Sequence, residues 1–72
     1  MYRTTDFQLA SFLLTRRHSL KDIETDERGR KVFIFDAEAV TDARAYFLDA
    51  PAPARTLLGH VRDLRGVLRE NL

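Results

Sequence analysis

The stretch Arg30-Lys31-Val32-Phe33-Ile34-Phe35-Asp36 decides the fold of this chain. It contains four consecutive large apolar or aromatic residues without helical spacing, and β-branched and aromatic side chains favour strands. A turn signal at residues 26–29 precedes it, and residues 20–25 match a partner strand. The pattern therefore predicts a β-hairpin whose three-residue loop, residues 27–29, places Gly29 in the left-handed conformation.

This loop also predicts the pairing of the two strands. It places three pairs opposite one another, namely Asp26 with Arg30, Ile23 with Phe33, and Lys21 with Phe35. Because side chains alternate along a strand, one face of the hairpin would be the core face, with Ile23, Phe33 and Phe35. The other face would be half apolar and half acidic, with Val32, Ile34, Asp22 and Glu24.

Helical patterns lie on both sides of the hairpin. The first helix is predicted from about Asp6 to Arg17, with Thr5 and Gln8 at the spacing of a capping box. A second is predicted from about Ala37 to Leu48, with Asp36 as its N-cap and a buried stripe of Val40, Ala43, Phe47 and Tyr46. A Pro-Ala-Pro segment at residues 51–53 ends it.

The third helix, about residues 53–71, has the most regular pattern in the chain. Apolar residues recur at helical spacing, namely Ala54, Leu57, Val61, Leu64, Leu68 and Leu72. Beside them runs a stripe of Arg55, Arg62, Arg65 and Arg69. Two glycines, Gly59 and Gly66, follow on the far side of the arginines, and each costs about 1 kcal/mol relative to Ala in a helix.

These elements predict a small single α+β domain over residues 1–72, in the order helix, β-hairpin, helix, helix. Tyr2-Arg3-Thr4 would add a short N-terminal third strand. Each apolar stripe must bury against another element. The expected core comprises Phe7, Leu13, Leu14, Phe33, Phe35, Phe47, Leu57, Val61 and Leu64.

Composition narrows the possible functions. The chain has no cysteine, so it has neither a disulfide nor a cysteine-based zinc site. Its two histidines, His18 and His60, lack the clustered partners of a metal site. No apolar run reaches the roughly 18 residues of a membrane span, and no signal peptide is evident. We expect a complete small cytoplasmic protein without cofactor or metal.

Several segments together resemble a known family. These are Thr5-Asp6-Phe7, the apolar run of residues 9–14, His18, residues 29–35, Ala45-Tyr46-Phe47 and the Arg/Leu-rich C-terminal helix. They resemble a family of short bacterial and phage proteins that is classed as a domain of unknown function. The resemblance implies a small prokaryotic domain and no particular activity.

Two functions fit these patterns, and neither is catalytic. The preferred one is protein–protein interaction, as a homodimer or with a larger partner, through Val32 and Ile34 with a rim of Asp22 and Glu24. The alternative is nucleic-acid binding through Arg55, Arg62, Arg65 and Arg69, although the net charge is only +1. No nucleophile, base and orienting group stand together, so we expect no catalytic residues and no small-molecule substrate.

Overall fold

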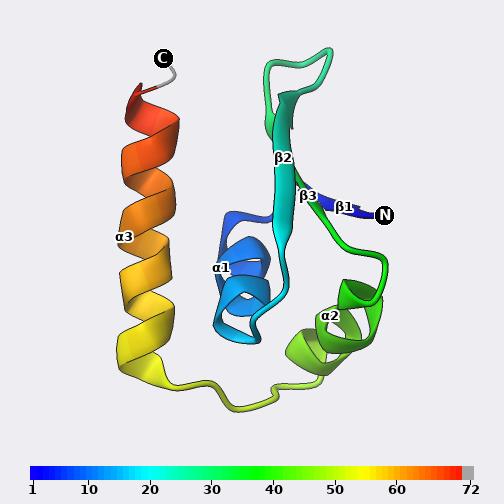
Figure 1. Ribbon diagram of the computed structural model, residues 1–72, viewed down its shortest axis with the longest axis vertical. Coiled ribbons are helices and arrows are strands. Elements are labelled where there is room, and N and C mark those ends of the chain that lie inside the picture. Colours follow the sequence, from blue (N-terminus) through cyan, green and yellow to red (C-terminus); the bar gives the residue numbers. More distant parts are fainter. Residues whose placement is uncertain (71–72) are drawn as a thin grey trace.

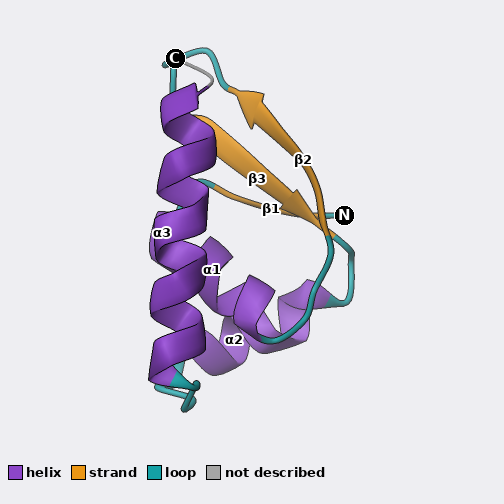
Figure 2. Ribbon diagram, turned by 60° about the vertical axis from the view of Figure 1, so that its left-hand side comes forward, coloured by secondary structure: helices purple, strands orange, loops and turns teal. Residues whose placement is uncertain are grey.

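Three helices cover one side of a three-stranded antiparallel sheet (Figures 1 and 2). The computed structural model describes residues 1–70. Its elements are β1 (Tyr2–Thr4), α1 (Phe7–Thr15), β2 (Leu20–Thr25), β3 (Lys31–Phe35), α2 (Ala39–Phe47) and α3 (Ala54–Glu70). The strand order β1-β3-β2 places β3 in the centre. The predicted α+β fold with its third strand is confirmed; positions 71 and 72, expected at the end of the last helix, lie outside the described residues.

The hairpin has the predicted loop and, over most of its length, the predicted pairing. Gly29 has a φ of 80°, its N–H donates to Asp26 O, and the Asp26 N–H donates to Arg30 O. Ile23 lies opposite Phe33. The prediction that Lys21 lies opposite Phe35 is wrong, because a bulge after Leu20 places that leucine there instead. The bulge keeps an apolar side chain on the core face and leaves Lys21 exposed.

Helix α1 is buried on every side and forms the centre of the domain. Residues 9–13 are each at most 2% exposed, and five consecutive positions span more than one full helical turn. Its neighbours are the sheet on one side, α2 on another and α3 on a third (Figure 1). The core cluster consists of Leu9, Ala10, Phe12, Leu13, Phe33, Phe35, Ala39, Ala43 and Leu64.

The start of α1 differs from the predicted capping box of Thr5 and Gln8. The N-cap is Asp6, whose carboxylate accepts hydrogen bonds from the backbone N–H groups of Gln8 at 3.0 Å and Leu9 at 3.1 Å. One carboxylate oxygen thus satisfies two of the free donors at the helix start. Its negative charge also lies at the positive end of the helix dipole, which a threonine hydroxyl cannot match.

The end of α1 turns the chain sharply toward the sheet. Arg17 has a φ of 66°, its N–H donates to Leu14 O, and the N–H of His18 donates to Leu13 O. These two bonds form a Schellman motif, a common helix ending. The turn brings His18 close to the residues that follow β3, where its side chain is 15% exposed.

Helix α2 begins two residues later than expected and presents a different face. The N-cap is Glu38 and not Asp36, whose carboxylate bonds the His18 ring and the Ser19 N–H. The buried stripe consists of Ala39, Ala43 and half-buried Tyr46. Val40 and Phe47, predicted to be buried, are 43% and 68% exposed. Two alanines allow α2 to approach α1 closely, and Tyr46 then packs on Phe12 with ring centroids 5.2 Å apart.

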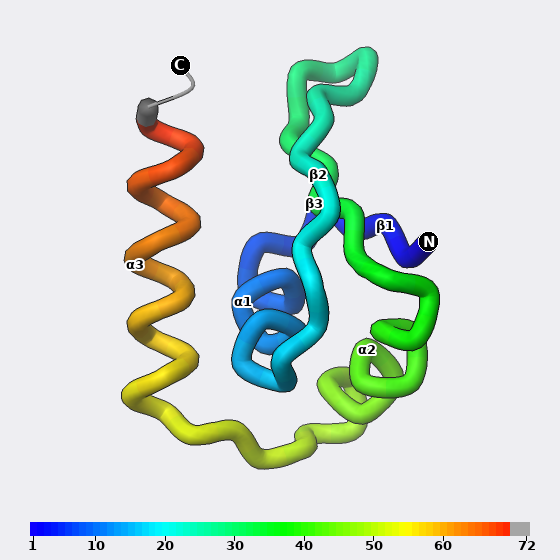
Figure 3. The backbone as a smooth tube through the Cα atoms, viewed as in Figure 1, coloured from blue at the N-terminus to red at the C-terminus, as the bar shows by residue number. Residues whose placement is uncertain are grey.

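Helix α3 packs chiefly against α1. The segment that joins α2 to α3 passes below α1 in the view of Figure 3, so α3 lies on the opposite side of α1 from α2. Leu64 is buried, while Leu57 and Leu68 are half-buried against the core. Because α3 has essentially one neighbour, most of its circumference faces solvent.

Phe12 is buried and Phe47 is exposed, so their truncation to alanine should change the free energy of unfolding by very different amounts. Phe12→Ala should lower the free energy of unfolding by about 3–5 kcal/mol, because Phe12 is fully buried. Phe47→Ala should lower it by less than about 1 kcal/mol, because surface truncations cost little. Urea unfolding of both variants measures this difference. Equal losses would show that Phe47 belongs to the core after all.

Candidate nucleic-acid interface

The apolar residues on the second face of the hairpin are covered by other residues of the same chain. Val32 and Ile34 are only 8% and 5% exposed, so the expectation of an open apolar strip there is wrong. Arg3 on β1 lies opposite Ile34, and Glu24 on β2 lies opposite Val32. Arg3 Nη2 and Glu24 Oε1 are 2.8 Å apart, so this ion pair crosses the central strand. The aliphatic stem of an arginine can cover apolar neighbours while its charged end stays in water.

This closure predicts the behaviour of a charged substitution at Ile34. Ile34→Lys should destabilise the fold by roughly 2 kcal/mol or more, because it removes buried apolar area and places an ammonium group there. Helical circular dichroism during urea unfolding would report the loss. A variant as stable as the parent would show that this face tolerates charge, and would restore it as a possible interface with Asp22 and Glu24 as its rim.

The four arginines of α3 form one continuous exposed surface, which we call the basic stripe: Arg55, Arg62, Arg65 and Arg69. At 100° per residue they fall within an arc of about 80°, and at 1.5 Å per residue they extend over about 21 Å. Asp63, the acidic residue in the middle of the helix, lies outside this arc. The structure thus brings together all four arginines predicted from the sequence.

Leu58 and the two glycines complete this surface. Leu58 lies within the arc of the arginines and is 66% exposed. Apart from the backbone of α3 itself and the neighbouring residues, a Cβ atom at Gly59 or Gly66 would meet no atom within 4 Å, so neither glycine is required for close packing against another segment. Shallow hollows lie between the arginines, and Leu58 and the glycines line them.

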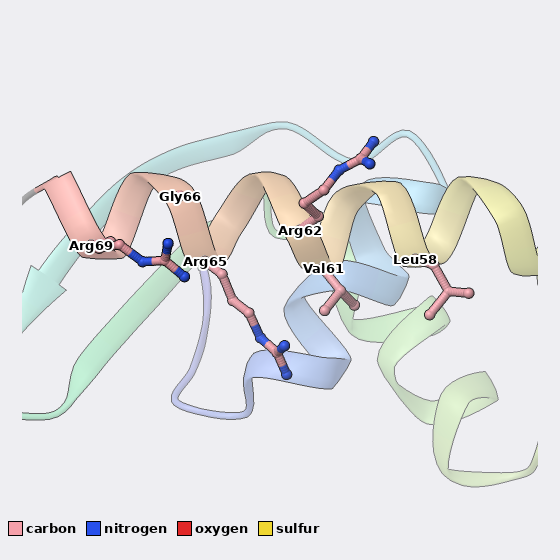
Figure 4. Close-up of a pocket in the computed structure, with 6 residues that line it drawn as sticks. All are labelled: Leu58, Val61, Arg62, Arg65, Gly66 and Arg69. Carbon is pink, nitrogen blue, oxygen red and sulfur yellow. The ribbon is translucent and has the colours of Figure 1, made fainter.

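The arginines differ in direction and in how firmly they are held. Figure 4 shows Arg65, with Val61 and Leu58, extending to one side of α3 and Arg62 to the other. The Arg65 guanidinium lies 5.7 Å from the centre of the Phe7 ring, a cation–π distance that holds it near α1. Among the side chains that the structure describes, no ion pair includes a residue of α3. These positive charges are therefore available to an anionic partner.

A second cluster of charged groups surrounds His18. Its Nδ1 lies 3.2 Å from Asp36 Oδ1, and its Nε2 lies 2.6 Å from Asp42 Oδ2. The other oxygen of Asp36 accepts the backbone N–H of Ser19. Arg16 lies 3.8 Å from Asp42 and donates to Pro51 O. The cluster joins the end of α1, the end of β3, α2 and the linker to α3.

The sequence analysis did not predict this cluster, because Asp36 and Asp42 are 18 and 24 residues away from His18 in the chain. Burial acts to lower the pKa of His18, but hydrogen bonds and charges from Asp42 and Asp36 outweigh it, so the pKa is raised. Both ring nitrogens donate only in the charged imidazolium. With a carboxylate on each nitrogen, His18 has no free position for proton transfer to a substrate, and the geometry is that of a structural link.

The raised pKa of His18 predicts a definite pH dependence of stability. The stabilisation is fully present below the ordinary value of about 6.5 and is lost as the pH rises through the higher folded value. The free energy of unfolding should therefore fall as the pH rises above about 6.5. Urea unfolding between pH 5 and 9 measures it. His18→Gln should remove this dependence and His60→Gln should keep it; an unchanged profile in His18→Gln would contradict the assignment.

The pKa of Asp36 determines the low pH at which the contact between His18 and Asp36 stops stabilising the fold. Desolvation acts to raise its pKa, but hydrogen bonds from the Ser19 N–H, His18 and the Ala39 N–H, together with the charge of His18, lower it. The stabilisation from a lowered carboxyl pKa is lost as the pH falls through the folded value. The link is therefore most stabilising between the ordinary pKa of Asp36, 3.8, and that of His18, 6.5.

Comparisons with known proteins add no family or activity. Neither the protein-family models, the curated proteins nor the solved structures include a match to this chain. The resemblance to a family of short bacterial and phage proteins therefore stays a prediction. Within residues 1–70, no helix combines the length and apolar character of a membrane span, and no group of three His, Cys, Asp or Glu side chains is arranged to hold a metal ion.

Proposed function

We propose that this chain is a non-catalytic cytoplasmic module that binds nucleic acid through the basic stripe of α3. The observation that carries the proposal is the row of four exposed arginines on one face of a single helix, without an ion pair among the described side chains. The hairpin surface, preferred from the sequence, has its apolar residues covered. The stripe is therefore the better-supported binding surface.

Phosphate is the anion that suits this surface best. A guanidinium donates two parallel hydrogen bonds to a phosphate and keeps its charge at every physiological pH. Arginines repeated along about 21 Å of helix can meet successive phosphates of one strand. Because the chain as a whole carries a net charge of only +1, attraction depends on this local surface rather than on the total charge.

A protein partner or a second copy of the chain is the second candidate. The observation that favours it is the exposure of Phe47 and Leu48, 68% and 82%, at the end of α2. Adjacent exposed apolar side chains are typical of association surfaces. Light scattering of the parent and of Leu48→Ser would test self-association; a monomeric parent would exclude the homodimer.

Replacement of the stripe should abolish binding and its salt dependence. The variant Arg55→Gln, Arg62→Gln, Arg65→Gln, Arg69→Gln should bind oligonucleotides at least tenfold more weakly than the parent at low salt. In the parent, log K should fall with log salt with a slope of about −3, since four contacts each release about 0.7–0.9 counterions. Fluorescence anisotropy measures both quantities.

The matched control removes the same charge elsewhere. It replaces four exposed basic residues outside α3 by Gln, namely Arg17, Lys21, Arg28 and Arg44. The control should bind with an affinity and a salt slope close to those of the parent. Equal losses in both variants would mean that only net charge matters, and no binding by the parent would end the proposal.

A further inference from the structure

An apolar hollow adjoins the basic stripe where the three helices meet. Its lining comes from α1, α2 and α3, namely Gln8, Tyr46, Leu57, Leu58 and Val61. Leu58 also lines both hollows between the arginines. Figure 4 shows Leu58 and Val61 pointing to the side of α3 on which the ribbons of α1 and α2 lie. The basic stripe and the apolar hollow are therefore adjacent, and Leu58 contributes to both.

The aromatic ring in this hollow is held in place. Tyr46 packs against buried Phe12 at 5.2 Å and against the exposed ring of Phe47 at 5.4 Å. A ring fixed from behind loses little freedom when a second flat group contacts it. Gln8, exposed at the rim, carries an amide that can both donate and accept hydrogen bonds.

We propose that this hollow takes the bases of a single-stranded nucleic acid whose phosphates lie on the basic stripe. The inference rests on the proposed function and names its substrate class. Aromatic surfaces beside a positively charged track are the arrangement by which proteins bind single strands. The bases of a duplex are paired and stacked inside it, so they cannot enter a hollow beside a helix.

The distribution of charge around α3 also favours one strand over a duplex. A helix in the major groove has a phosphate backbone on either side. Here the helical positions of the four arginines fall within an arc of about 80°, and Gly66, Gly59 and then Asp63 follow on one flank of it. A single phosphate track flanked by an apolar hollow matches one strand, with phosphates on the arginines and bases on the Tyr46 side.

The test compares four probes of equal length by fluorescence anisotropy at low salt: oligothymidine, oligouridine, an abasic strand and a duplex. At least one of the two base-containing single strands should bind about tenfold more tightly than the abasic strand and the duplex. The abasic strand keeps its phosphates, so it isolates the contribution of the bases. Whichever of oligothymidine and oligouridine binds more tightly shows whether the protein prefers single-stranded DNA or RNA.

Two variants locate the bases, and one serves as a control. Tyr46→Ala should weaken binding of the preferred single strand by about 5- to 100-fold, the range expected for one base stack. Leu58→Ala, at a largely exposed position that tolerates truncation, should weaken it about fivefold. Val67→Ala, an exposed apolar residue elsewhere on α3, should leave it unchanged. None of the three should change binding of the abasic strand.

The contrary outcomes separate this inference from the proposed function. If all four probes bind equally and only the arginine variant loses affinity, the stripe binds phosphates and the hollow takes no base. If Leu58→Ala disrupts self-association while oligonucleotide affinity is unchanged, the hollow belongs to a protein contact and the inference is overturned. If no probe binds at all, the inference and the proposed function both fail.

Discussion

Burial of α1 on all sides is the constraint on which the rest of the structure depends. Five consecutive positions, residues 9–13, are almost inaccessible, so the helix needs a neighbour in every direction. Even the hydroxyl of Ser11 is satisfied locally, by donation to Phe7 O. In so small a domain, the sheet, α2 and α3 must each cover one side of the same helix. The core therefore forms where the sheet, α2 and α3 each pack against the central helix α1.

This arrangement explains why α3 can carry a binding surface. A helix with a single neighbour needs only a narrow apolar stripe, and the remainder of its circumference can be charged without cost to the core. The arginines occupy this free surface, and the Arg65 guanidinium packs over the ring of Phe7 on α1. Packing of Leu57, Leu64 and Leu68 against the core fixes the position of α3, and the arginine side chains on its far side are exposed.

Two further groups of charged residues stabilise the fold. The Arg3–Glu24 pair joins the two edge strands across β3, so the outer face of the sheet is shielded without a second layer of helices. His18 links Asp36 and Asp42, which attaches α2 to the hairpin although α2 buries little more than two alanines and half of a tyrosine. The polar contacts of His18 thus compensate for the small apolar area that α2 buries.

Local patterns in the sequence determined the elements, the hairpin loop and the arginine row. The glycine at position 29, the Val-Phe-Ile-Phe run and the apolar periodicity of α3 each act through neighbours within a few residues, so they can be interpreted without the fold. The same local reasoning predicted the pairing of Ile23 with Phe33 and the exposure of all four arginines on one face.

Only the tertiary structure decided which surfaces remain open. The Arg3–Glu24 pair and the His18 cluster join residues about 20 positions apart, and no local pattern specifies such contacts. The first covers the outer face over Ile34, and the second links Asp36 to His18 and Asp42 through the imidazole ring. The buried stripe of α2 is set by its fit against α1, which favours Ala39 and Ala43 over Val40 and Phe47. The chain specifies its helices and strands locally, but packing between distant segments selects the faces that they expose.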